Sequence, residues 1–213
     1  MGAVAAGVVF GLVAAVIGII RSVLRRRRPE PLPTDKLPEV SPTEPSMSYL
    51  RSVAKAELRT LTTDFDSSDS QGDTRPGDCL DAAMLLLDGD TGRISEADAT
   101  TLVAVVVLAR AGRAALAGKA YNRCCAVNPL HGPAVGRHHV RLSAEARGRR
   151  LLHVCGPCRD TATATPAALH TRVLTLPAGG ARVPYEEADA LLTAVPEEIR
   201  RLIERVKERV HVP

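Results

Sequence analysis

The chain has 213 residues, of which 45% are hydrophobic but only 2% aromatic, and its formal net charge at pH 7 is +4. Five positive charges, Arg21 and Arg25 to Arg28, directly follow an uncharged N-terminal stretch, and without them the chain carries −1. The overall charge therefore gives no reason to expect nucleic-acid binding, and the few aromatic residues predict a core of Ala, Val and Leu.

The first predicted element is a transmembrane helix within residues 1–24. Every residue from Ala3 to Ile20 is Ala, Val, Leu, Ile, Phe or Gly, and a helix of this length, at ~1.5 Å per residue, is about long enough to cross a ~30 Å hydrocarbon layer. Arginines behind the helix favour the cytoplasmic side, which predicts a single-pass protein of the cell membrane with its C-terminal bulk in the cytoplasm. Residues 3–28 are then expected to contact lipid. A cleaved signal peptide is the alternative, but its charges would precede the apolar region.

Two connections and one helix are predicted before the main domain. Residues 25–45 are basic and then Pro-rich, with six prolines between positions 29 and 45, and this composition predicts an extended linker. Residues 46–66 predict an amphipathic helix capped by Ser46, whose apolar face packs on the domain, on a partner protein or on a second copy. Residues 67–77 are rich in Ser, Asp and Gly and predict a loose connection.

A small α+β domain, mainly helical, is predicted for residues 78–213. It begins with a helical pair within residues 78–118, the second helix starting with Ser95 as its N-cap. This second helix is apolar enough to resemble a span, but Arg110 and Arg113 follow too soon, so we expect a buried helix whose arginines extend to solvent. The connection from Asp88 to Asp98 resembles a calcium loop, but its Gly and closing Glu stand at the wrong positions.

Cysteine and histidine residues gather in a predicted β-hairpin within residues 121–160. The strand-like runs are Arg137 to Leu142 and Arg150 to Val154. In a reducing cytoplasm, clustered thiols are more often metal ligands or redox groups than disulfides. The spacing predicts a structural, zinc-ribbon-like site, with these ligands at the base of the hairpin: Cys125, His131, Cys155 and Cys158.

Several alternatives for this cluster remain open. Cys124 competes with Cys125 as the first ligand, and each of three nearby histidines is an alternative to His131, although we expect them to be exposed: His138, His139 and His153. The Cys-Gly-Pro-Cys sequence is also typical of thiol-disulfide oxidoreductases, but residues 159–166 are poor helix formers and too little chain follows for that fold. Ordinary structural thiols are the third interpretation.

The remaining signals are weaker. Arginines on the hairpin suggest contact with nucleic acid, but no interleaved aromatic residues are present to stack on bases, so such binding is not expected. Residues 196–211 predict an amphipathic C-terminal helix that starts at Pro196 and carries a Glu197–Arg201 ion pair. This helix packs on its own domain or on a second copy, so homo-oligomerisation is an open alternative.

A family resemblance adds to this interpretation. The segment Leu108 to Leu116, the sequence Cys-Ala-Val-Asn-Pro-Leu-His-Gly at 125–132, the later Cys-x-x-Cys and Val-Pro-Tyr at 183–185 together resemble uncharacterised actinobacterial membrane-anchored proteins. The similarity covers roughly residues 78–200. It implies that Cys125 rather than Cys124 is the family position, and it implies no activity or metal.

The sequence thus predicts a membrane-tethered cytoplasmic interaction or scaffold module, with an unknown protein partner and without catalytic activity. Its fold would be organised by zinc. The enzymatic alternative is thiol-disulfide exchange by Cys155 and Cys158.

Overall fold

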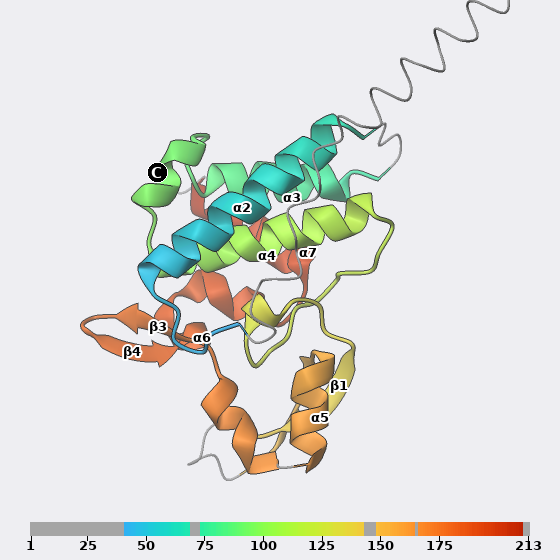
Figure 1. Ribbon diagram of the computed structural model, residues 1–213, viewed down its shortest axis with the longest axis vertical. Helices are drawn as coiled ribbons and strands as arrows, with labels where there is room; N and C mark the ends of the chain where they lie inside the picture. Colours follow the sequence, from blue (N-terminus) through green and yellow to red (C-terminus); the bar gives the residue numbers. More distant parts are fainter. Residues whose placement is uncertain (1–40, 69–72, 143–147, 165, 211–213) are drawn as a thin grey trace, which may run out of the picture. The chain divides into compact units, whose positions relative to one another are not determined.

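The computed structural model describes residues 41–68, 73–142, 148–164 and 166–210 (Figure 1). The predicted transmembrane helix 1–24 and the linker as far as residue 40 lie outside the described residues. What the structure describes is an α+β fold, mostly helical, with two small antiparallel hairpins.

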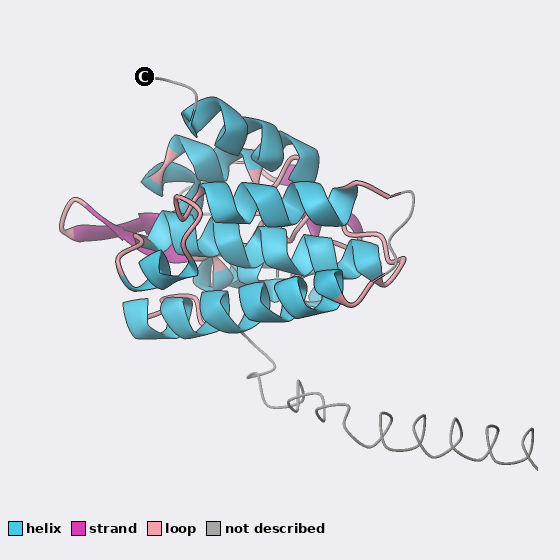
Figure 2. Cartoon of the chain, turned by 90° about the horizontal axis from the view of Figure 1, so that it is seen from above, coloured by secondary structure: helices cyan, strands magenta, loops and turns pink. Residues whose placement is uncertain are grey.

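Four helices form the larger part of the fold, and α2, α3 and α4 lie side by side in Figures 1 and 2. Helix α4 packs against both α2 and α3, and α7 packs against α3. The bounds of these helices are α2 (Met47–Asp66), α3 (Arg75–Leu85), α4 (Ala99–Leu116) and α7 (Ile199–Val210).

Helix α2 lies where the sequence predicts an amphipathic helix. The Ser46 side chain accepts a hydrogen bond from the Tyr49 backbone N–H, which caps the first turn. Its apolar face, with Leu50, Leu58 and Leu61, is buried inside the domain. The apolar face is therefore covered by the chain's own core. Of the three predicted alternatives, this is packing on the domain rather than on a partner protein or a second copy.

The starts of three helices differ from the predictions. Helix α3 begins at Arg75, inside the predicted connection 67–77, because Pro76 fits the first helical turn, where its missing N–H removes no hydrogen bond. Helix α4 is capped by Asp98, which accepts from Thr101 N–H, and not by Ser95, which ends a short 3-10 helix, η2 (Thr91–Ser95). Helix α7 begins at Ile199 rather than Pro196.

Helix α4 is the central core helix. Among the described residues it is also the one helix that is long and apolar enough to cross a membrane, with a mean hydropathy of 1.6 over 18 residues, but 67% of it is buried within the domain. Its arginines do not extend freely to solvent as predicted. Arg110 and Arg113 both bind the carboxylate of Glu57 on α2, at 2.7 and 2.8 Å.

The first hairpin pairs β1 (Gly136–Val140) with β2 (Arg150–Val154), close to the predicted strands. Gly136 lies opposite Val154, and Val140 lies opposite Arg150. The hairpin is flanked by η3 (Pro129–His131) and α5 (Gly156–Ala164). Part of the predicted turn, residues 143–147, lies outside the described residues.

A second hairpin, β3 (Thr175–Ala178) and β4 (Ala181–Pro184), is absent from the sequence predictions. Its turn is formed by Gly179 and Gly180, both with positive φ, and a Gly-Gly pair between short strands is a recognisable hairpin signal. The other short helices are η4 (Pro166–Arg172), α6 (Tyr185–Ala188) and η5 (Ala190–Ala194).

The buried residues form two separate cores. The larger core lies among the helices. The smaller one, called the hairpin core below, joins the first hairpin, α5 and η4, and its buried members are Cys125, Val127, Val140, Val154, Cys155, Cys158, Ala162, Leu169 and Val173. Three cysteines therefore replace part of the aliphatic packing that a core of this size would otherwise contain.

Candidate metal centre

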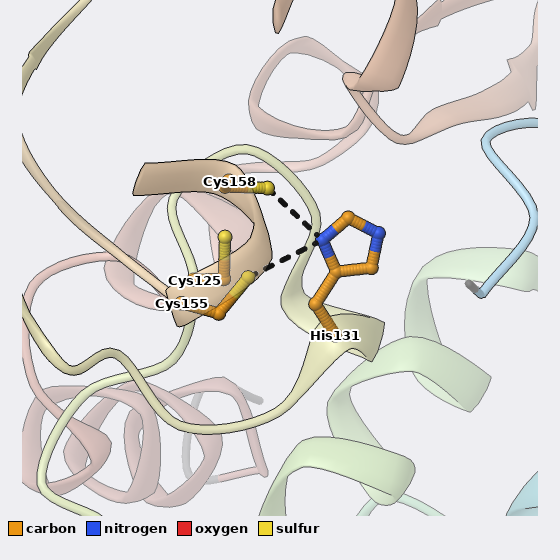
Figure 3. A group of neighbouring side chains, drawn as sticks. All are labelled: Cys125, His131, Cys155 and Cys158. Carbon is orange, nitrogen blue, oxygen red and sulfur yellow. Dashed lines mark hydrogen bonds between the residues drawn. The ribbon is translucent and has the colours of Figure 1, made fainter. Parts of the chain in front are cut away.

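The structure brings together the four residues that the sequence predicts as metal ligands (Figure 3). One ligand atom from each of Cys125, His131, Cys155 and Cys158 lies within 4.8 Å of the other three. The His131 Nδ1 atom is 3.3 Å from the Cys158 sulfur and 3.7 Å from the Cys155 sulfur. Three sulfur atoms and one imidazole nitrogen thus face one point, which is a group that could hold a metal ion.

The turn that carries Cys125 and His131 is built by the residues between them. The Asn128 side chain accepts a hydrogen bond from Leu130 N–H, and Pro129 begins the 3-10 turn η3. Gly132 has φ 93° and ψ −154°, a conformation open essentially to glycine alone, and its carbonyl accepts from Cys125 N–H at 3.0 Å. Each fixed residue of Cys-x-x-Asn-Pro-x-His-Gly therefore has a geometric role.

Cys155 and Cys158 lie at the junction of β2 and α5. The Cys155 carbonyl accepts from Arg159 N–H, so this residue stands at the start of the helix, and Cys158 lies within its first turn. The prediction that residues 159–166 are poor helix formers is wrong for most of this segment. Thr161 and Thr163 are accommodated because their hydroxyl groups donate to backbone carbonyls of the preceding turn.

The two halves of the cluster are held in register by the backbone. Ala126 N–H donates to the His153 carbonyl, and Val135 N–H donates to the Val154 carbonyl, both at 2.9 Å. These bonds add the chain beside Cys125 to the edge of the hairpin. As a result, Cys125 and Cys155 lie next to each other although they are far apart in the sequence.

Electrostatics within the cluster indicate a shared negative charge. Hydrogen bonds from Cys155 and Cys158 hold the pKa of Cys125 far below its ordinary value. Burial lowers the pKa of His131, but hydrogen bonds to Cys125 and Cys155 outweigh burial and raise this pKa to about 9. The thiol of Cys158 is hydrogen-bonded to Cys125, which raises its pKa. A thiolate stabilised beside a half-buried imidazole is a site that a cation can neutralise.

Cys124 is separated from this cluster. Its sulfur is buried in the larger core and donates to the Val195 carbonyl at 3.0 Å, and burial raises its pKa. Cys79 is also buried among the helices, where burial raises its pKa to about 12. Among the alternatives left open by the sequence, Cys125 is therefore the member of the cluster.

The other histidines also lie apart from the ligand group formed by the described residues. The His153 Nε2 atom lies 3.1 Å from both Arg123 Nη1 and Arg137 Nε. His139 is exposed and His138 half-buried on β1. His131 is thus the imidazole of the cluster, and its Nε2 atom is buried without a hydrogen-bond partner among the described residues.

The helices support the turn of residues 125–132, which we call the metal turn, through the Leu130 carbonyl, a contact that the sequence analysis did not predict. Leu130 precedes His131, and its carbonyl accepts from Arg110 Nη1 at 2.6 Å, while Glu57 fixes the same arginine. A sequence signal did exist, since Glu57 is a carboxylate on the apolar face of α2, and a buried carboxylate requires a partner.

The segment just before α2 is also fastened to the metal turn. The Ser41 hydroxyl donates to the Leu130 carbonyl at 2.8 Å, and the Asn128 amide donates to the Pro42 carbonyl at 3.3 Å. Thr175 N–H on β3 donates to the Thr43 carbonyl at 2.9 Å. We call residues 41–45 the clasp.

No protein-family model, curated protein or solved structure matches this chain. The resemblance to actinobacterial membrane-anchored proteins therefore stays a sequence-based prediction, and the function must be argued from the site itself.

Proposed function

We propose that this protein is a non-catalytic, membrane-tethered interaction or scaffold module whose hairpin core is organised by one zinc ion. The observation that carries the proposal is the convergence of four buried or half-buried ligand atoms within 4.8 Å of one another. Residues 3–28 provide the membrane tether, and the domain faces the cytoplasm.

Zinc suits this donor set better than the other common protein metals. Three thiolates and one imidazole are the ligands of structural zinc sites, which are tetrahedral and have no open position. Calcium and magnesium prefer oxygen ligands, which this cluster lacks. Because all four ligands come from the protein, the metal stabilises the fold and no position remains for a substrate.

The structural role is supported by where the cluster lies. The hairpin core has few large aliphatic side chains, and its cysteines lie at its centre. A core of this size gains little from hydrophobic burial alone, and zinc ligation commonly supplies the missing stability in such small units. Without metal, three buried cysteines would contribute only weak packing.

Thiol-disulfide exchange is the second candidate, and one observation favours it. Cys155 stands between a strand and a helix, at a helix start where a thiolate is stabilised. Burial argues against it, because Cys155 is 4% exposed and Cys158 is fully buried. A disulfide substrate must reach a sulfur atom, so this candidate requires the turn to open.

Metal content is the decisive measurement. The full chain, purified in detergent under reducing conditions, should contain about one zinc per molecule, and chelation should remove structure together with the metal. A protein that is free of metal, stays folded and reduces a model disulfide would contradict the proposal and support exchange.

Two buried cysteines provide a matched comparison. Cys158→Ser should abolish stoichiometric zinc, because it removes a ligand. Cys124→Ser should keep the zinc, because Cys124 is outside the cluster and a serine hydroxyl can still donate to the Val195 carbonyl. Equal loss of zinc in both variants would show that the cluster is not the site.

A further inference from the structure

A second candidate site lies between the first hairpin and the start of α7, and none of the four cluster residues lines it. It is a hollow of about 510 Å³ that we call the arginine groove, and four arginines line it: Arg123, Arg137, Arg200 and Arg201. His153 lies among them, and Leu151, Leu152 and Pro196 add an apolar side. A hollow of this volume accommodates a small ligand.

The groove contains more hydrogen-bond donors than acceptors. Arg123 Nη1 and Arg137 Nε both point at the same atom, His153 Nε2, each at 3.1 Å. That nitrogen has one lone pair in the neutral imidazole and none when it is protonated, so it cannot satisfy two guanidinium groups. One donor is left over when this nitrogen is unprotonated, and both are left over when it carries a proton.

The ion pairs at the groove also leave more arginines than carboxylates. Arg123 is paired with Glu198 at 2.6 Å, but Arg137 belongs to none of the ion pairs formed by the described residues. Arg200 and Arg201 share a single carboxylate, that of Glu204, at 3.8 and 3.2 Å. Even with Glu197 and Glu198 on its wall, the groove is therefore positive.

We propose that the arginine groove binds a phosphate group. Several oxygens on one anion can accept from more than one guanidinium at once, which a carboxylate does less well. The start of α7 at the groove adds a favourable helix dipole. The apolar side suits the uncharged part of a phosphate compound or of a lipid headgroup, whereas the absence of Phe, Tyr and Trp from the groove disfavours stacked bases.

The test uses the full chain in neutral detergent micelles, with inorganic pyrophosphate as the probe and calorimetry as the readout. Pyrophosphate should bind to the unaltered chain, and Arg137→Gln should weaken binding about tenfold or more. Arg137 is exposed on β1 and hydrogen-bonds only to His153 among the described residues, so this variant should keep its fold, as circular dichroism would check.

The matched control is Arg59→Gln on the exposed face of α2, which removes the same charge at a residue that does not line the groove. It should leave pyrophosphate binding unchanged. The proposal is overturned if the unaltered chain does not bind pyrophosphate, or if both variants weaken binding equally, which would indicate diffuse attraction to a basic surface.

A second arm identifies the source of the phosphate. The chain is placed in nanodiscs of phosphatidylcholine with or without phosphatidic acid, and pyrophosphate binding is measured again. If the unaltered chain binds pyrophosphate more weakly in the nanodiscs with phosphatidic acid, and Arg137→Gln shows no such difference, the groove is assigned to a lipid headgroup. If the unaltered chain binds pyrophosphate equally in both kinds of nanodisc, the groove is assigned to a soluble phosphate compound.

Discussion

Gly132 shows how one backbone conformation places a candidate metal ligand. It directly follows His131, and its φ of 93° lets its carbonyl turn back to Cys125 N–H. A Cβ at this position would meet open space, since no atom lies within 4 Å of it. Any cost of a side chain there is therefore conformational rather than steric.

We expect Gly132→Ala to destabilise the protein by about 1–3 kcal/mol, because alanine disfavours this region of φ and ψ, and to weaken zinc binding. The measurements are denaturant unfolding and metal competition. Gly136→Ala is the control, because a Cβ there is equally unobstructed and φ is not positive. Similar losses in both variants would remove the conformational explanation.

Protonation of the cluster should oppose metal binding. His131 and Cys158 both have raised pKa values, that of His131 being about 9, so near pH 7 both protons must leave before a metal binds. Raising the pH removes this competition, and zinc affinity should increase by roughly tenfold per pH unit for each displaced proton between pH 6 and 9. Competition titration against a chelator of known pH dependence measures the zinc affinity at each pH. An affinity that is flat with pH would exclude these two ligands.

At the scale of elements, the pairing of α2 with α4 is reinforced by a buried carboxylate. The side chains of Glu57 and Arg110 are only 9% and 16% exposed, and the same carboxylate also binds Arg113. Because Arg110 reaches on to the Leu130 carbonyl, this group connects the helical core to the metal turn.

Glu57→Gln should cost about 3 kcal/mol of unfolding free energy, because it leaves Arg110 without a carboxylate partner in a poorly hydrated place, whereas Arg113 keeps its pair with Asp64. It should also reduce zinc affinity, since Arg110 would no longer be fixed beside Leu130. Asp88→Asn is the control: it breaks the exposed Asp88–Arg93 pair and should change stability by less than ~1 kcal/mol. If both variants had equally small effects, the Glu57 pair would contribute no more than a surface pair does.

Short-range signals explain which elements could be predicted. The Ser46 cap, the apolar run of α4 and the first hairpin are encoded within a few neighbouring residues, and so is the Cys-x-x-Cys half of the cluster. Within α7, Arg201 pairs with Glu204 and not with Glu197 as predicted. The start of α7 depends on distant contacts, because Arg123 binds Glu198 and the Glu197 carbonyl. No local pattern contains that information.

The candidate site also depends on both local sequence signals and distant contacts. Spacing was sufficient to nominate its four ligands, whereas the distinction between Cys124 and Cys125 required the fold, because adjacent residues in an extended segment point to opposite sides. Here one sulfur enters the helical core and the other enters the hairpin core.

At the scale of the whole domain, the two cores should respond differently to loss of metal. Chelation should increase amide exchange in β1, β2 and α5, which surround the cluster, while α2 and α4 keep their protection because their core contains no ligand. Hydrogen exchange followed by mass spectrometry resolves the two regions. Uniform loss of protection would show that the metal supports both cores equally.

The clasp would give the candidate metal centre a mechanical role if the chain is tethered to a membrane as proposed. Ser41 and Pro42 are bonded to the turn between Cys125 and His131, and α2 begins only at Met47. If a bilayer holds the N-terminal end of the chain, tension along the chain reaches this turn before it reaches the helices. The four zinc ligands would then resist this tension, and the force that the tethered domain withstands before it unfolds would depend on whether the metal is bound.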